Sequence, residues 1–103
     1  MSEVVYEVNL AVDAAIEGEY RAWLREHIAD MLALPGFLDA RVFDVIDPPP
    51  AAGRIAICTH YRLRDAAALQ DYFDQHAPRL RGEGMARFGG RFSASRRVLR
   101  AGA

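Results

Sequence analysis

The chain has 103 residues, of which 51% are hydrophobic and 26% are charged, values typical of a single globular domain. No apolar run approaches the roughly 20 residues that cross a bilayer, and the first residues lack the basic and apolar regions of an export signal, so we expect neither a membrane nor a secreted protein. The net charge is −1, and the single cysteine, Cys58, allows no internal disulfide, which predicts a cytoplasmic location.

The first strand is predicted at residues 4–12, where apolar residues alternate with others along the chain. The apolar face consists of Val4, Tyr6, Val8, Leu10 and Val12. Asp13 occupies a helix N-cap position, and Glu17 in the first turns complements the helix dipole. The helix is predicted over residues 14–34, because apolar residues recur at spacings of three and four, and Pro35-Gly36 ends it.

The middle of the chain predicts a β-hairpin. Residues 37–46 form a second strand that is largely apolar on both faces, and the proline-rich residues 47–53 make a longer hairpin loop. The third strand, residues 54–63, alternates strictly. Its bulky face consists of Ile55, Ile57, Thr59, Tyr61 and Leu63, and its small or polar face of Ala56, Cys58, His60 and Arg62.

A second helix is predicted from Ala66, with Asp65 as its N-cap. Its inward side chains are Leu69, Tyr72, Phe73 and His76. Pro78 cannot donate a helical hydrogen bond, so the helix kinks there or restarts with Pro78 in its first turn. A short, less regular segment should follow, lined by Leu80, Met85 and Phe88. After Gly89-Gly90, residues 92–99 form the fourth strand.

The predicted order β-α-β-β-α-β is that of an α+β, ferredoxin-like fold, with a four-stranded antiparallel sheet of order 4-1-3-2 and two helices on one face. The other face mixes polar and apolar residues, whereas a face left in water should turn cleanly polar. Two such faces packed together would bury on the order of 1,600 Å² in total, a standard specific interface. We therefore predict a homodimer.

Three stretches carry a family resemblance: Tyr6 to Leu10, Trp23 to Ile28 and Ala86 to Arg97. With the element order and the half-polar sheet face, they resemble an uncharacterised family of short bacterial proteins in the dimeric α/β-barrel superfamily. The resemblance covers nearly the whole chain and implies a dimeric α/β barrel. The superfamily includes antibiotic-biosynthesis monooxygenases, haem-degrading monooxygenases, small isomerases and stress-induced proteins, so the resemblance implies an architecture rather than an activity.

The haem-degrading monooxygenases imply one candidate site. They use an asparagine on the first strand, a tryptophan, and an iron-binding histidine on the second helix, and Asn9 and His76 match two of these positions. The single tryptophan, Trp23, lies on the first helix instead. Because the match is incomplete, we predict no haem or other cofactor, and His76 remains a packing residue or a ligand-binding one.

His60 and Glu7 are the predicted catalytic residues. The first and third strands are neighbours in this fold, so the carboxylate of Glu7 can orient the imidazole of His60 and raise its basicity. Asn9, Cys58 and Arg62 would line a cavity beside this pair, with Arg62 holding an anionic group. The alternative is a polar interface network that binds no ligand.

His27 is a further ligand-binding candidate. It lies one helical turn from Trp23 and from Met31, on the core-facing side of the first helix. It is either a half-buried structural histidine or a proton donor or acceptor beneath the helices, because imidazole titrates near neutrality.

The sequence predicts no metal site. The three histidines have no short ligand spacing such as H-x-x-x-H, and Cys58 has no cysteine partner. Cys58 as a nucleophile would need an exposed, electropositive setting, so a small core-like cysteine is favoured.

The charge distribution is uneven. Residues 78–103 contain seven arginines and one glutamate, whereas residues 1–77 contain six arginines and thirteen acidic residues. We expect the basic end to pair with the acidic part of the chain or of a partner. Nucleic acid is disfavoured, because the central strands present no exposed aromatic pair, and Gly89-Gly90 lacks the lysine and spacing of a phosphate loop.

The sequence therefore predicts a small-molecule-binding homodimer with cofactor-free proton-transfer or oxygenase chemistry, if the protein is an enzyme. The alternative is a non-catalytic stress or interaction module whose sheet face serves only dimerisation. The volume beside His60 discriminates between the two, because a partly polar pocket there favours ligand chemistry.

Overall fold

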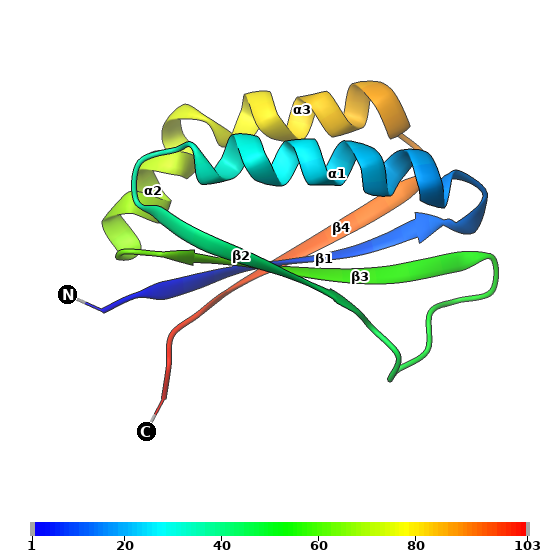
Figure 1. The fold of residues 1–103 in the computed structure, drawn as a ribbon, viewed down its shortest axis with the longest axis horizontal. Helices are drawn as coiled ribbons and strands as arrows, with labels where there is room; N and C mark the ends of the chain where they lie inside the picture. Colours follow the sequence, from blue (N-terminus) through cyan, green and yellow to red (C-terminus); the bar gives the residue numbers. More distant parts are fainter. Residues whose placement is uncertain (1, 103) are drawn as a thin grey trace.

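A computed structural model describes residues 2–102. The elements are β1 (Val4–Asp13), a 3₁₀ helix (Ala14–Ile16), α1 (Glu17–Leu32), β2 (Phe37–Asp44), β3 (Arg54–Leu63), α2 (Ala66–Gln75), α3 (Ala77–Phe88) and β4 (Phe92–Leu99). The strands form one antiparallel sheet of order β2-β3-β1-β4. Figure 1 shows the three helices on one face of the twisted sheet. The predicted ferredoxin-like α+β fold is confirmed.

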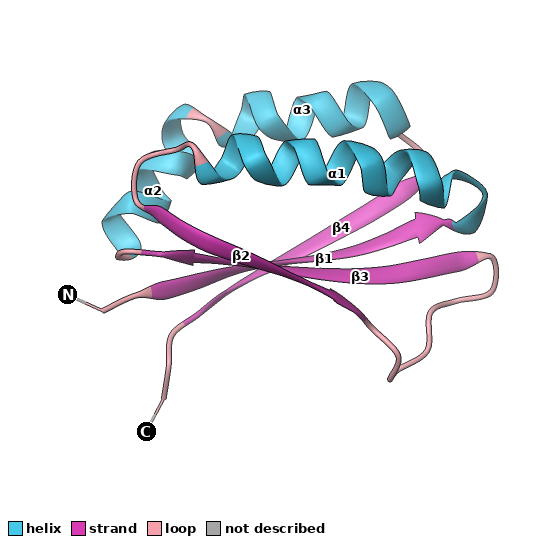
Figure 2. Cartoon of the chain, in the orientation of Figure 1, coloured by secondary structure: helices cyan, strands magenta, loops and turns pink. Residues whose placement is uncertain are grey.

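The core lies between the helices and the two central strands, β1 and β3 (Figure 2). The register pairs Tyr6 with Tyr61 and Leu10 with Ile57, so the bulky residues of both strands share the helix-covered face. One buried cluster surrounds Tyr6, Tyr61 and Leu63, and a second surrounds Leu10 and Phe88. Burying each large apolar side chain stabilises the fold by about 1.5–3 kcal/mol.

The connection after β1 differs from the prediction. Asp13 makes no side-chain cap hydrogen bond, because its carboxylate pairs with Arg54 at 3.3 Å and with Arg91 at 3.8 Å. The chain therefore passes through a 3₁₀ turn before α1 begins at Glu17, and α1 ends at Leu32. The turn into β2 needs Gly36, which has a φ of 85° and whose Cβ would collide with Ala68.

The second half contains two helices, because the chain restarts as α3 with Pro78 in its first turn, one of the two predicted alternatives, and only the irregularity predicted for the following segment is wrong. Asp65 caps α2 as expected, accepting a hydrogen bond from the backbone N–H of Ala68 at 2.9 Å. The prediction that His76 is an inward residue of the second helix is wrong. His76 is half-buried and lies at the junction between α2 and α3. Pro78 lies in the first turn of α3, where its missing N–H costs nothing, so α3 is regular. Met85 is 58% exposed, contrary to the prediction.

The second face of the sheet is not covered by any helix of residues 2–102 (Figure 1). We call the residues that point to this side the open face. They are Val5, Glu7, Asn9, Ala11, Asp39, Arg41, Phe43, Ala56, Cys58, His60, Arg62, Ser93, Ser95, Arg97 and Leu99. Within residues 2–102, no helix has the length and apolar character needed to cross a membrane.

Candidate functional site

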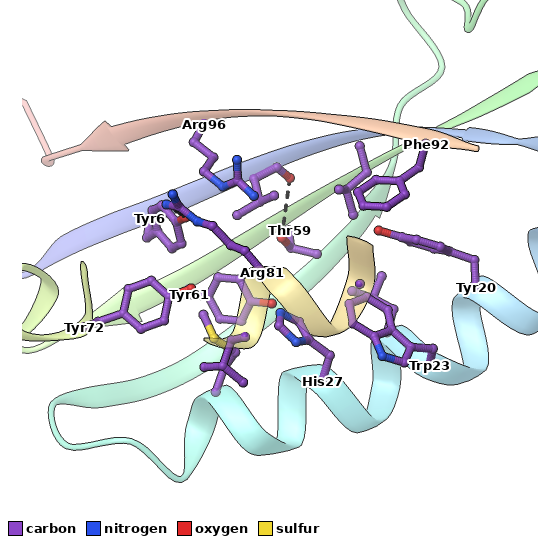
Figure 3. A pocket seen from close by; sticks show the side chains of 16 residues that line it. Tyr6, Tyr20, Trp23, His27, Thr59, Tyr61, Tyr72, Arg81, Phe92 and Arg96 are labelled. Atoms are coloured by element: carbon purple, nitrogen blue, oxygen red, sulfur yellow. Dashed lines mark hydrogen bonds between the residues drawn. The ribbon is translucent and has the colours of Figure 1, made fainter. Parts of the chain in front are cut away.

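A cavity of about 50 Å³ lies between the helices and the sheet (Figure 3). Its wall combines aliphatic side chains with six aromatic ones, Tyr6, Tyr20, Trp23, Tyr61, Tyr72 and Phe92. The basic groups in the wall are His27, Arg81 and Arg96, and no carboxylate of residues 2–102 is part of it. The cavity is thus apolar with a positive side, a combination that suits an aromatic anion.

His27 is held in this wall by α1. Its ring stacks on that of Trp23, one helical turn earlier, with centroids 4.7 Å apart. Its Nδ1 atom is buried, and no protein group hydrogen bonds to it. Burial lowers the pKa of His27, so the imidazole is neutral at pH 7 and can accept a proton. In Figure 3 the imidazole points into the cavity.

The tyrosine hydroxyls of the wall are hydrogen-bond donors. Burial raises the pKa of Tyr20 and of Tyr72 to about 12, and raises that of Tyr61 as well. These phenols therefore stay protonated at neutral pH and cannot act as bases. Of the groups that line the cavity, His27 is the one suited to accept a proton.

The two arginines come from α3 and β4. Arg81 donates a hydrogen bond to the hydroxyl of Tyr6 at 3.0 Å, and Arg96 follows Ala94 on the helix-facing side of β4. Both residues are exposed, so they form the outer wall of the cavity. The close approach of α3 depends on Gly84, where a Cβ would lie 3.0 Å from Cη2 of Trp23.

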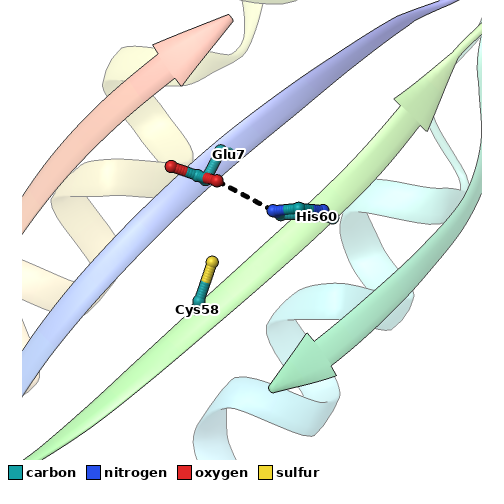
Figure 4. Close-up of side chains that lie close together, drawn as sticks. All are labelled: Glu7, Cys58 and His60. Atoms are coloured by element: carbon teal, nitrogen blue, oxygen red, sulfur yellow. Dashed lines mark hydrogen bonds and ion pairs between the residues drawn. The ribbon is translucent and has the colours of Figure 1, made fainter. Parts of the chain in front are cut away.

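The predicted catalytic pair lies on the opposite side of the sheet. The buried carboxylate of Glu7 contacts His60 Nε2 through Oε2 at 2.8 Å (Figure 4). Its Oε1 accepts hydrogen bonds from Arg97 Nε at 2.6 Å and from Asn9 Nδ2 at 2.8 Å. The hydrogen bond from Arg97, with those from Asn9 and His60, lowers the pKa of Glu7 to about 2. The predicted contact between Glu7 and His60 is confirmed.

The seven predicted site residues fall in different places. Glu7, Asn9, Cys58 and His60 lie together on the open face. Arg62 shares this face but binds Glu3 and Asp39. His27 lies beneath the helices, and His76 lies at the α2–α3 junction beside Arg79. A groove of about 310 Å³ on the open face is lined by Asn9 and the proline segment 48–50 and not by His60.

Sequence reasoning missed most of the helix-side cavity. Tyr61 and Tyr72 were recognised only as core residues. The one feature of the sequence that indicated this cavity was Arg96, a charged residue among the alternating apolar residues of the fourth strand. Arg81 gave no signal, because α3 was not predicted as a regular helix.

Comparison with known families gives a match over residues 3–101 to the family described as Domain of unknown function (DUF4286). The chain belongs to this family. No curated protein matches this DUF4286 sequence.

Solved structures resemble this DUF4286 protein over nearly its whole length. SnoaB, a cofactor-independent oxygenase from Streptomyces nogalater, has a TM-score of 0.73 at 14% identity, covering 100% of this chain and 96% of SnoaB. A candidate antibiotic biosynthesis monooxygenase from Deinococcus radiodurans has a TM-score of 0.72 at 13% identity, covering 97% and 93%. A conserved protein from Methanosarcina mazei has a TM-score of 0.73 at 12% identity, covering 99% and 95%. At such identities the likeness shows the fold alone.

Proposed function

We propose that this DUF4286 protein binds a small aromatic anion in the helix–sheet cavity and that His27 exchanges a proton with it. The observation that carries the proposal is the Nδ1 atom of His27, which is buried without a protein hydrogen-bond partner. An unsatisfied buried polar atom costs about 1–3 kcal/mol. A ligand that hydrogen bonds to Nδ1 removes this cost, so its binding is favoured at this position.

The surrounding groups support cofactor-free acid–base chemistry. Neutral His27 accepts a proton from a phenol or from a C–H next to a carbonyl, and Arg81 and Arg96 stabilise the anion that forms. An electron-rich anion of this kind can react directly with dioxygen. SnoaB is a cofactor-independent oxygenase, and we propose the same class of chemistry here.

The size of the cavity sets a condition on binding. About 50 Å³ holds a few water molecules, at about 10–15 Å³ each, whereas pockets for organic ligands measure about 300–1,000 Å³. A ring-sized ligand therefore requires the outer wall to open. Arg81 and Arg96 can swing outward because both side chains reach the surface.

We propose further that the open faces of two copies pack together in a cytoplasmic homodimer. Phe43, 36% exposed, contributes an apolar surface beside His60. The Glu7 network then becomes part of the interface, as the polar-network alternative predicted. The helix-side cavity stays outside this interface.

The test is a titration with 4-nitrophenol, an aromatic acid whose anion is coloured, followed by quenching of the fluorescence of Trp23, the single tryptophan. We expect saturable quenching, and at least about tenfold weaker binding in His27→Gln, equivalent to about 1.4 kcal/mol. The matched control, His76→Gln, should bind like the wild type. Equal binding by His27→Gln, or no saturable quenching, contradicts the proposal and leaves the non-catalytic interaction module.

A further inference from the structure

We propose that Glu7, Cys58 and His60 form a binding site for a zinc-like divalent metal ion on the open face of the sheet. One ligand atom from each residue, a carboxylate oxygen, the thiol sulfur and an imidazole nitrogen, lies within 4.8 Å of the other two (Figure 4). The site is separate from the proposed ligand site at His27, which lies on the other side of the sheet, but it lies on the face that forms the proposed dimer interface.

The strand register brings these side chains together. Glu7 is paired with His60, and Asn9 with Cys58, across the antiparallel β1–β3 ladder. Side chains of alternate residues point to the same side of a strand, so all three ligands project from the open face. β1 and β3 are the two inner strands, which fixes their backbones on both sides. The ligands come from two distant strands, so no short spacing in the sequence reveals them.

The donor set suits zinc. Imidazole nitrogen, thiolate sulfur and carboxylate oxygen are all common zinc ligands, with bonds of about 2.0–2.3 Å. Tetrahedral geometry with such bonds places ligand atoms about 3.3–3.7 Å apart. The three ligand atoms lie within 4.8 Å of one another, so Cys58 Sγ must approach by at most about 1 Å. His60 Nε2 must move slightly away from Glu7 Oε2, now 2.8 Å distant. As a thiolate, Cys58 adds a second negative charge to that of Glu7, which Arg97 already pairs with at 2.6 Å.

The surrounding hydrogen bonds prepare Glu7 for this role. Arg97 and Asn9 both donate to Oε1, which leaves Oε2 directed at His60. Outer hydrogen bonds of this type orient metal ligands and typically change metal affinity by about 10–100-fold. The side chain of Glu7 is only 5% exposed, while that of His60 is 33% exposed. Metal can thus enter from the open face of a single protomer, and in the proposed dimer the fourth ligand position lies at the interface between the two copies.

Cobalt(II) provides the test, because a cobalt–thiolate bond gives a charge-transfer absorption band. The chain contains one cysteine, so any such band must come from Cys58. We expect a band that saturates at about one cobalt per chain, consistent with this single site, is displaced by zinc, and is lost in Cys58→Ser. His60→Gln and Glu7→Gln should bind at least about tenfold more weakly, and Asn9→Ala about 10–100-fold more weakly.

His76→Gln is the matched control and should leave the titration unchanged, because His76 lies at the α2–α3 junction. Circular dichroism of each variant checks its fold, and if one ligand variant unfolds, the other decides the result. The proposal is overturned if folded wild-type protein gives no thiolate band. It is also overturned if the folded ligand variants, His60→Gln and Glu7→Gln, keep wild-type affinity, since cobalt would then bind Cys58 alone.

Discussion

His27 and His60 lie on opposite sides of the sheet, and their surroundings differ in kind. His27 stacks on Trp23 in an aromatic wall and has a buried nitrogen without a protein partner. His60 contacts the carboxylate of Glu7, which Arg97 also binds. The surroundings of His27 favour its neutral imidazole. The contact of His60 with Glu7 orients the two side chains as the proposed metal ligands. Each histidine therefore has its own test.

The depressed pKa of His27 predicts a pH dependence of stability. In the unfolded chain, the His27 imidazole has an ordinary pKa of 6.5, so it takes up a proton more readily than the same imidazole in the folded protein. The stability of the folded protein is therefore undiminished by His27 above pH 6.5, and it falls as the pH drops from 6.5 towards the lowered pKa of His27 in the folded protein. Urea unfolding at several pH values should show this loss in wild type and in His76→Gln, and a flatter profile in His27→Gln. Parallel profiles in all three proteins contradict it.

Glu7 predicts a second loss of stability at lower pH. Its pKa falls from 4.5 to about 2 in the folded protein, chiefly through the hydrogen bond from Arg97. The resulting stabilisation is present above pH 4.5 and is lost as the pH falls from 4.5 towards 2. Acid unfolding followed by circular dichroism should show a smaller decline between these values in Glu7→Gln. An unchanged decline would mean that the ion pair with Arg97 does not form.

At the scale of elements, one helix cap was predicted correctly and one was not. Asp65 caps α2 through the N–H of Ala68, as its sequence position indicates. Asp13 has the same residue type at an equivalent position, but Arg54 and Arg91 bind its carboxylate. Those arginines are distant in sequence, so a local pattern does not reveal the competition.

Asp65→Ala should lower the free energy of unfolding by about 1 kcal/mol, the typical value of a lost N-cap. Asp71→Ala, an exposed acidic residue within the same helix, is the control and should change stability by less than about 0.5 kcal/mol. Urea unfolding measures both. Similar losses in the two variants would show that the cap hydrogen bond contributes little.

The strands were predicted more accurately than the helices. Arg54–Leu63 and Phe92–Leu99 have the predicted bounds, because strict alternation fixes both the extent and the buried face of a strand. The predicted adjacency of β1 and β3 also indicated the contact of Glu7 with His60. The cavity was not predictable, because it requires Arg81 on α3, Arg96 on β4 and His27 on α1 to converge through tertiary packing.

At the scale of the whole molecule, the sheet separates two surfaces with different roles. The helix side encloses the His27 cavity, while the open face carries the proposed dimer interface and metal ligands. Phe43→Glu should shift the protein towards the monomer in sedimentation velocity at micromolar concentration. Met85→Glu is the control, because Met85 is also an exposed apolar residue but lies on α3. A monomeric wild-type protein, or a dimer insensitive to Phe43→Glu, contradicts the proposed interface.

The central claim is that His27 receives a ligand at its buried Nδ1 atom. NMR of protein with isotope-labelled histidine measures it most directly, since the ring nitrogens of the three histidines can be assigned with Gln variants. We predict a neutral His27 in the free protein at pH 7, and ring signals that move on addition of 4-nitrophenol in parallel with quenching of Trp23. A His27 that is charged in the free protein, or signals that stay fixed while Trp23 is quenched to saturation, would contradict the claim.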